Sequence, residues 1–161
     1  MSGQLALDTE RNEIVKPIVS IDDAIKAKKQ FDDLCNRLLD KNDYQLIGNK
    51  PFKKKSAWRK LAQVFNLSDE ILSADKTIRE DKSFFWEFTV KAIAPNGRYT
   101  VATGSCDSKE RNFAHVEHDV KATAHTRAKS RAISDLIGGG EVSAEELEFE
   151  DNRIANAKKV N

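Results

Sequence analysis

The sequence predicts an α+β protein in which a long helix covers one face of an antiparallel sheet. Residues 84–94 alternate between two faces with a period of two, and one face is firmly apolar, which is typical of a half-buried strand. A turn at residues 95–97, Pro-Asn-Gly, leads into a return strand over residues 98–106. Residues 114–137 then read as one long helix, which the glycines at 138–140 end in a way that suits a left-handed C-cap.

The stretch before this hairpin, residues 68–81, is ambiguous. Ile71, Leu72 and Ile78 permit a strand, which would pair with residues 84–94 across a turn at 81–83. The predicted order is then strand, strand, strand, helix. Such a β-β-β-α core places its helix on one face of an antiparallel sheet.

The long helix has two distinct faces. Ala128, Ala132 and Ile133 fall on one side of it, with Leu136 and Ile137. The opposite side carries Thr123, Arg127, Arg131 and Ser134. Because the two arginines are four residues apart, they project together. This side can be a solvated helix face or a phosphate-binding ridge, and the helix alone favours the solvated face.

An additional N-terminal helix is predicted over residues 21–40. Apolar side chains recur there at helical spacing, and Ser20 is a suitable N-cap. Residues 1–17 are polar and lack sustained periodicity, so we expect a flexible N-terminus. The predicted domain covers residues 18–140, and residues 141–161 form an acidic and mixed tail.

Two further elements are expected between this helix and the sheet. Residues 43–52 look extended, with a turn at Gly48-Asn49. A second helix follows over residues 57–67, and Ser56 can cap it.

Size and composition indicate one polar domain. The chain has 161 residues, which is enough for a real core, and its hydrophobic and charged contents of 39% and 33% describe a soluble protein. No apolar run approaches the length of a membrane span, and no secretory signal appears at the start of the sequence. Two reduced cysteines, Cys35 and Cys106, are the default for an intracellular protein, so we expect a cytoplasmic location.

The net charge of +1 conceals a segregation of charge. Residues 50–60 include six basic side chains, whereas residues 141–151 include six acidic ones. A basic block with an acidic tail suggests binding to a polyanion. Within the acidic stretch we expect at most a short helix near residues 144–149.

Motifs for nucleotide hydrolysis and for nucleophilic catalysis are missing. The Gly48-Asn49-Lys50 sequence lacks the upstream glycine and the downstream Ser or Thr of a phosphate-binding loop. There is no Gly-x-Ser-x-Gly elbow, and neither cysteine has the context of a nucleophile. We therefore expect a protein that is not an enzyme and has no cofactor.

One cysteine and three histidines could together form a metal site. Their spacing matches no familiar motif, and neither CxxC nor HExxH is present. Histidines near the core face of a helix usually pack or cap, so a metal site is the weakest alternative. The four residues are Cys106, His115, His118 and His125.

The basic segment at residues 50–60 is the strongest functional signal, because apolar residues alternate with its charges. Lysines neutralise backbone phosphates, and an exposed aromatic ring can stack on a base. Trp58 lies on the apolar stripe of a predicted helix and suits the core better than a stacking role, whereas Phe52 suits either. The residues narrowly favour nucleic-acid binding. The candidate contacts here are Lys50, Phe52, Lys53, Lys54, Lys55 and Arg59.

Three stretches between residues 44 and 140 together resemble the Rad Fifty-Two family, the single-strand annealing proteins of homologous recombination. The first stretch is the extended piece and the short helix with Leu61-Ala62 and Phe65-Asn66. The second is the hairpin ending PNGRYTVATGS, where the family has its turn glycine, tyrosine and small residue at Gly97, Tyr99 and Gly104. The third is the long helix with Arg131-Ala132-Ile133 near its glycine end.

The resemblance implies a β-β-β-α core that assembles into a ring or a helical filament. Single-stranded DNA would lie in a basic outer groove, and homologous strands would anneal without ATP. By position, the family's groove residues fall near Arg131, with Arg127 one turn earlier, and near Phe52, Lys82, Lys109 and Arg111.

The chain also departs from the family pattern. The family often has a Lys-Arg pair where this chain has Ser130-Arg131, and a further basic position falls near Ser134. No long C-terminal region for recruiting a recombinase follows, so that partner is not implied. Two other functions remain open: an oligomeric interaction scaffold whose acidic tail recruits a partner, and a metal-dependent hydrolase.

Overall fold

The structure, a computed structural model, describes residues 15–147. The chain forms two compact units, Met1–Asn36 and Arg37–Asn161. The main element of the first unit is helix α1, Ile21–Leu38. Ser20 caps this helix as predicted, because its Oγ accepts a hydrogen bond from the Asp23 backbone N–H at 3.1 Å. The expected flexible N-terminus lies largely outside the described residues.

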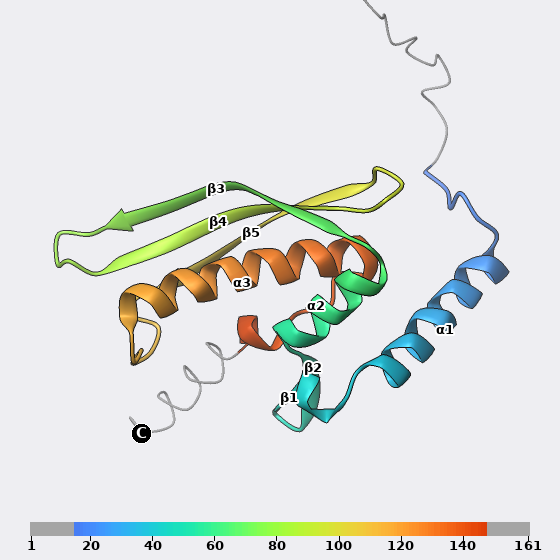
Figure 1. Ribbon diagram of the computed structural model, residues 1–161, viewed down its shortest axis with the longest axis horizontal. Coiled ribbons are helices and arrows are strands. Elements are labelled where there is room, and N and C mark those ends of the chain that lie inside the picture. Colours follow the sequence, from blue (N-terminus) through green and yellow to red (C-terminus); the bar gives the residue numbers. More distant parts are fainter. Residues whose placement is uncertain (1–14, 148–161) are drawn as a thin grey trace, which may run out of the picture. The chain divides into compact units, whose positions relative to one another are not determined.

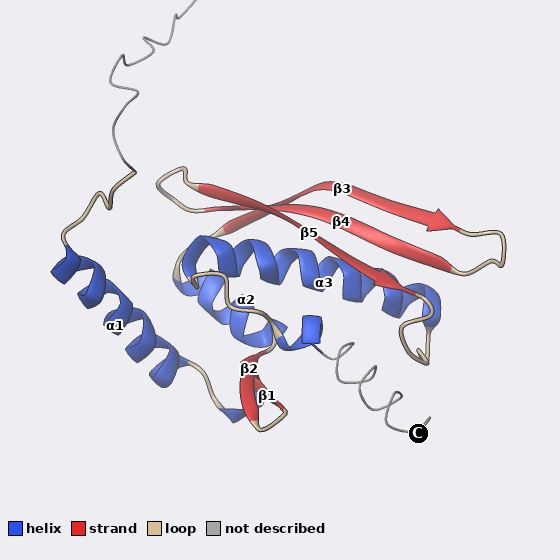
Figure 2. Ribbon diagram, turned by 180° about the vertical axis from the view of Figure 1, so that it is seen from behind, coloured by secondary structure: helices blue, strands red, loops and turns tan. Residues whose placement is uncertain are grey.

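The second unit contains a β-β-β-α core. Strands β3 (Ser68–Ile78), β4 (Phe84–Ile93) and β5 (Tyr99–Asp107) form an antiparallel sheet in the order β3-β4-β5. The ambiguous stretch at residues 68–81 is therefore a strand. Helix α3, Val116–Ile137, lies across one face of this sheet (Figure 1). The view from behind shows the same two layers (Figure 2). The predicted α+β class is confirmed.

The sheet face that meets α3 is the apolar face predicted for residues 84–94. Phe88, Val90 and Ala92 of β4 are at most 3% exposed, and the register places Phe88 opposite Gly104 of β5. Gly104 permits a close approach between the layers, since a Cβ there would lie 2.3 Å from the backbone nitrogen of Ala128. The helix thus packs directly on the backbone of β5, which explains the small residue at this position.

A short hairpin precedes the sheet. A 3-10 helix, Lys41–Asp43, leads into β1 (Tyr44–Ile47) and β2 (Lys50–Lys53), which pair antiparallel. The predicted turn is confirmed, because Gly48 and Asn49 adopt φ values of 56° and 66°.

Helix α2, Lys55–Val64, packs through Ala57, Trp58 and Leu61, which are at most 1% exposed. The core role of Trp58 is confirmed. The prediction that Ser56 caps this helix is wrong: the N-cap is Lys54, whose side chain makes no capping hydrogen bond. A distant carboxylate takes that role, since Glu145 Oε1 accepts a hydrogen bond from the Lys55 backbone N–H at 2.8 Å.

Helix α3 is covered on more sides than its sequence predicts. Arg127 and Ser134, predicted on the side opposite the apolar face, are 9% and 1% exposed. The reason is that the β5 edge and residues 141–147 cover this side. Ser134 Oγ donates a hydrogen bond to the Glu141 carbonyl at 2.6 Å, and Arg127 Nε donates to the Glu145 carbonyl at 3.1 Å.

Residues 141–147 are an integral part of this unit, although the sequence suggested that a tail begins at 141. Ser143 and Ala144 are at most 1% exposed, and residues 144–147 form a helical turn. The rest of the short helix expected near 144–149 lies outside the described residues. The chain between Gly138 and Gly140 turns sharply toward this segment, with φ values of 66° and 79° at Gly139 and Gly140.

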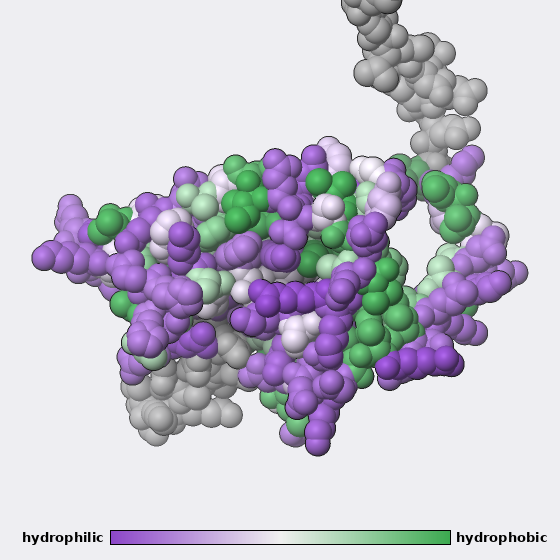
Figure 3. All heavy atoms as spheres, in the orientation of Figure 1, coloured by the Kyte–Doolittle hydropathy of each residue, from purple (hydrophilic) through white to green (hydrophobic). Residues whose placement is uncertain are grey.

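The visible surface is mostly hydrophilic, with a hydrophobic area where α2 passes into β3 (Figure 3). Val64, Ile71 and Leu72 in this part of the chain are about half exposed. Across residues 15–147, no helix is both long and apolar enough to cross a membrane.

Candidate nucleic-acid interface

A trough runs along α3 where this helix faces the start of α2. It consists of two adjoining hollows of about 320 and 40 Å³, which share Lys55 and Thr126 in their walls. The larger hollow extends toward the start of α3 and includes Arg111 and His118. The smaller one extends toward the middle of α3 and includes Arg59 and Lys129. Four cationic side chains from two helices and a loop therefore line these two adjoining hollows, which together we call the α2–α3 trough.

The electrostatics of the α2–α3 trough favour an anion. Among the described residues, neither the Lys55 ammonium nor the Arg59 guanidinium has an ion-pair partner. Lys129 is paired with Asp69 of β3 at 3.0 Å. Asp119 and Glu145 also line the larger hollow, so its charge is mixed. The smaller hollow contains three cations and no carboxylate in its wall.

Neutral polar groups complete the smaller hollow. His125 lies in its wall and stacks on Phe88, with ring centroids 5.1 Å apart. Burial, and to a lesser degree the nearby Lys129, lower the pKa of His125, so its ring is neutral at pH 7. His125 Nε2 and Trp58 Nε1 are both buried without a hydrogen-bond partner within the described part of the chain.

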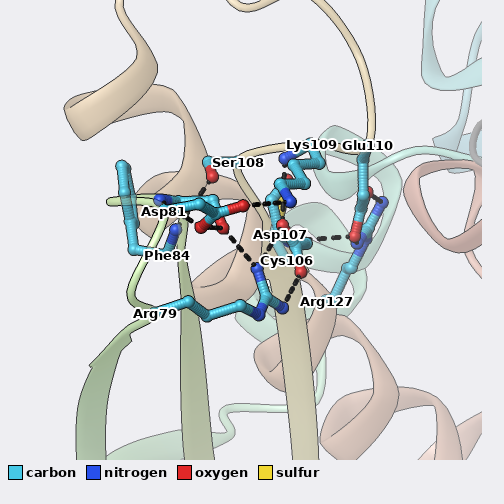
Figure 4. A network of polar contacts seen from close by, with 10 residues as sticks. Arg79, Asp81, Phe84, Cys106, Asp107, Ser108, Lys109, Glu110 and Arg127 are labelled. Atoms are coloured by element: carbon cyan, nitrogen blue, oxygen red, sulfur yellow. Dashed lines mark hydrogen bonds and ion pairs between the residues drawn. The ribbon is translucent and has the colours of Figure 1, made fainter.

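Arg127 and Arg131 lie outside this trough, on the side of α3 that faces the β5 edge. The Arg127 guanidinium makes two hydrogen bonds to Glu110, both of 2.9 Å (Figure 4). It makes a third to the Ser105 carbonyl at 2.8 Å. Burial is the largest single influence and opposes the charge, but the hydrogen bonds that Arg127 donates to Glu110, together with the attraction of nearby negative charges, raise the pKa of Arg127. Arg127 is therefore a buried structural cation in this structure.

Arg131 is more accessible, with 45% of its side chain exposed. It donates hydrogen bonds to the Thr103 carbonyl at 2.9 Å and to Glu146 Oε2 at 2.8 Å. Lys53 is held in a similar way, since its ammonium lies 2.6 Å from Glu141 Oε2. The rings of Tyr44 and Trp58 lie within 6 Å of the same ammonium.

Lys82 and Lys109 lie at the far end of the β3–β4 hairpin, in a different region of the second unit. Lys82 is exposed in the turn, with a φ of 66°. Lys109 pairs with Asp81 at 2.5 Å, and Arg79 beside it pairs with Asp107 (Figure 4). Hydrogen bonds from Lys109 hold the pKa of Asp81 below its usual range, and those from Arg79 do the same for Asp107.

The remaining predicted contacts are on and after strand β2. Lys50 is exposed in the hairpin, whereas Phe52 and Lys54 are half-buried. The structure thus brings together Lys55, Arg59 and Arg111, and it places the other predicted residues outside the trough.

Sequence reasoning missed Lys129, His118 and His125 as members of this site. A signal for Lys129 was present, because it is four residues after His125 and four before Ile133, on the same helical face. What the sequence could not show is that α2 faces this side of α3.

The four residues of the alternative metal site are not gathered. Cys106 is completely buried beneath α3, and burial raises the pKa of its thiol to about 12. His115 and His118 are exposed. Between residues 15 and 147, no group of three or more potential His, Cys, Asp or Glu ligands is close enough to hold a metal ion.

Comparison with known proteins does not assign a family. No family model matches the chain, and no curated protein shows significant similarity to it.

Proposed function

We propose that this protein binds single-stranded DNA and anneals complementary strands without ATP, acting as a homo-oligomer in recombination or repair inside the cell. The observation that carries the proposal is the α2–α3 trough, whose two adjoining hollows are lined by Lys55, Arg59, Lys129 and Arg111. The resemblance of residues 44–140 to the Rad Fifty-Two family supports it.

The trough suits a phosphate backbone better than a small molecule. Its cations come from separate elements and follow the length of α3, as the charges of one strand would require. Phosphate contacts fix a strand in place but carry no base identity, so the bases remain available for pairing. An oligomer repeats these contacts along one strand, so modest affinity per subunit is sufficient.

The triple variant Lys55→Ala, Arg59→Ala and Lys129→Ala tests this site. We expect a fall in affinity for labelled oligo-dT in fluorescence anisotropy. The plot of log affinity against log salt should flatten by about 0.7 for each phosphate that the variant no longer neutralises, as for single strands. The fall in affinity should be similar for oligonucleotides of mixed sequence.

A matched control removes three exposed lysines outside the trough, Lys26, Lys29 and Lys41. Its affinity and salt slope should stay close to those of the wild type. A folded triple variant that binds like this control would exclude the trough as the DNA site. Complementary oligonucleotides mixed with the wild type, with and without ATP, test annealing separately. A wild type that binds no oligonucleotide would refute the function and favour the interaction scaffold.

A further inference from the structure

We propose that the acidic segment at residues 141–146 is a built-in competitor for DNA, whose carboxylates occupy cations beside the α2–α3 trough that the strand would contact as it leaves the trough. The proposal rests on the DNA-binding function above and adds a means of regulating it. We call these residues the acidic clasp.

Three carboxylates of the acidic clasp reach three different elements. Glu141 Oε2 lies 2.6 Å from Lys53 Nζ of β2. Glu145 Oε1 accepts the hydrogen bond of the first backbone N–H of α2 at 2.8 Å. Glu146 Oε2 accepts one from Arg131 of α3 at 2.8 Å. Each carboxylate therefore occupies a positive group that could otherwise hold a phosphate.

The clasp is also next to the α2–α3 trough. Glu145 lies in the wall of the larger hollow together with Lys55 and Arg111. A strand entering there would meet this carboxylate at the positive end of α2. The phosphates of DNA and the carboxylates of the clasp repel each other at this short range, so they compete for the same cations.

The backbone of the clasp is fixed, whereas its ion pairs with Lys53 and Arg131 each have one exposed partner. Ser143 and Ala144 are buried, and the carbonyls of Glu141 and Glu145 accept hydrogen bonds from α3. The Glu141 side chain, in contrast, is 42% exposed. The Glu146 side chain is only 14% exposed, but its partner Arg131 has 45% of its side chain exposed, so water can compete for this contact from the arginine side. Exchange of side-chain partners requires no unfolding of the segment.

The test is the double variant Glu141→Gln and Glu146→Gln, which removes two charges and keeps the buried backbone and the Glu145 cap. Binding of labelled oligo-dT should tighten by roughly 3- to 10-fold at low salt, since each partly exposed ion pair changes an equilibrium by a few-fold. The salt slope should steepen by up to about 0.7 for each released cation that contacts a phosphate. At high salt, the two affinities should converge.

A matched control, Asp32→Asn with Glu117→Gln, removes two charges and breaks two ion pairs, with Lys28 and Lys76, outside the trough. Its affinity should rise by less than about twofold, because general attraction alone is screened by salt. Circular dichroism and thermal unfolding establish that each variant is folded.

The possible outcomes distinguish a failure of the clasp proposal from a failure of the proposed DNA-binding function. If the wild type binds DNA and the folded clasp variant binds equally or more weakly, or no better than the control, the clasp is only structural and the function stands. If neither protein binds DNA, both proposals fail. If the double variant is unfolded, the single variant Glu141→Gln decides: it should tighten binding, and unchanged binding would overturn the clasp.

Discussion

Arg127 is the residue at which helix α3, strand β5 and the acidic clasp meet. Its guanidinium binds Glu110 twice, the Ser105 carbonyl and the Glu145 carbonyl. Glu110 is itself only 12% exposed in its side chain, so the two charges depend on each other. Removing one partner of a buried pair leaves the other charge without compensation.

Arg127→Ala should therefore lower the free energy of unfolding by about 3–5 kcal/mol in urea denaturation. Arg131→Ala, one turn later and 45% exposed, is the control and should cost about 1 kcal/mol or less. If Arg127→Ala changes the free energy of unfolding only slightly but alters DNA affinity, the result would support the phosphate-binding ridge that the sequence analysis considered.

Gly104 is the second position at which one residue sets the packing of two elements. A Cβ would lie 2.3 Å from Ala128 N and 2.8 Å from its Cα, and backbone atoms cannot rotate away as a side chain can. Gly104→Ala should force α3 from the sheet and destabilise the protein by about 1–3 kcal/mol. The adjacent exposed Ser105→Ala should be close to neutral. Thermal unfolding of the two variants checks this, and equal melting temperatures would contradict the close contact.

At the scale of elements, charge joins the β3–β4 hairpin to the loop before α3. Arg79, at the end of β3, pairs with Asp107 at the end of β5, whose side chain is 28% exposed. Because hydrogen bonds from Arg79 lower the pKa of Asp107 in the folded state, the unfolded chain binds the proton more readily. The stabilisation is complete above the ordinary pKa of 3.8 and is lost as pH falls through the lower folded pKa.

Asp107→Asn should thus cost about 1 kcal/mol at pH 7 and progressively less below pH 4, until the variant and the wild type are equally stable. Chemical denaturation at pH 7 and near pH 2.5 measures both differences. The control Asp32→Asn breaks an exposed ion pair on α1 and should cost about 1 kcal/mol or less at pH 7. A constant cost of Asp107→Asn at both pH values would indicate a role in packing rather than charge.

Local patterns predicted the elements better than the site. The alternation in residues 84–94, the Gly48-Asn49 turn and the Ser20 cap each depend on neighbouring residues, and the structure has all three. The errors at Ser56 and Arg127 share a different cause. Lys55, next to Ser56, and Arg127 both bind Glu145, and no periodicity within α2 or α3 can show a partner from a later segment of the chain. The same cause explains in part why the sequence analysis did not predict the α2–α3 trough.

For the whole molecule, the sheet has one protected edge and one open edge. Arg131 and Arg127 donate hydrogen bonds to the Thr103 and Ser105 carbonyls of β5. Strand β3 is the other edge, and no strand in the described part of the chain pairs with its outer side. Leu72 and Ile78 on β3 are 48% and 64% exposed. An open, partly apolar edge is a place where another chain can add.

Light scattering should therefore give a mass several times that of one chain, as expected for a closed ring or a short filament. Leu72→Lys with Ile78→Lys should reduce this mass while leaving the circular dichroism unchanged, because both side chains are already exposed and charge blocks edge pairing. Tyr99→Lys with Val101→Lys adds the same charge to exposed positions of β5 and should leave the assembly intact. If only the Tyr99→Lys and Val101→Lys variant has a reduced mass, the interface is on the β5 side of the sheet and not at the β3 edge. A monodisperse wild-type monomer, with and without DNA, would refute the predicted assembly. A monomer would also lack the repeated contacts along one strand that allow weak phosphate binding to hold DNA.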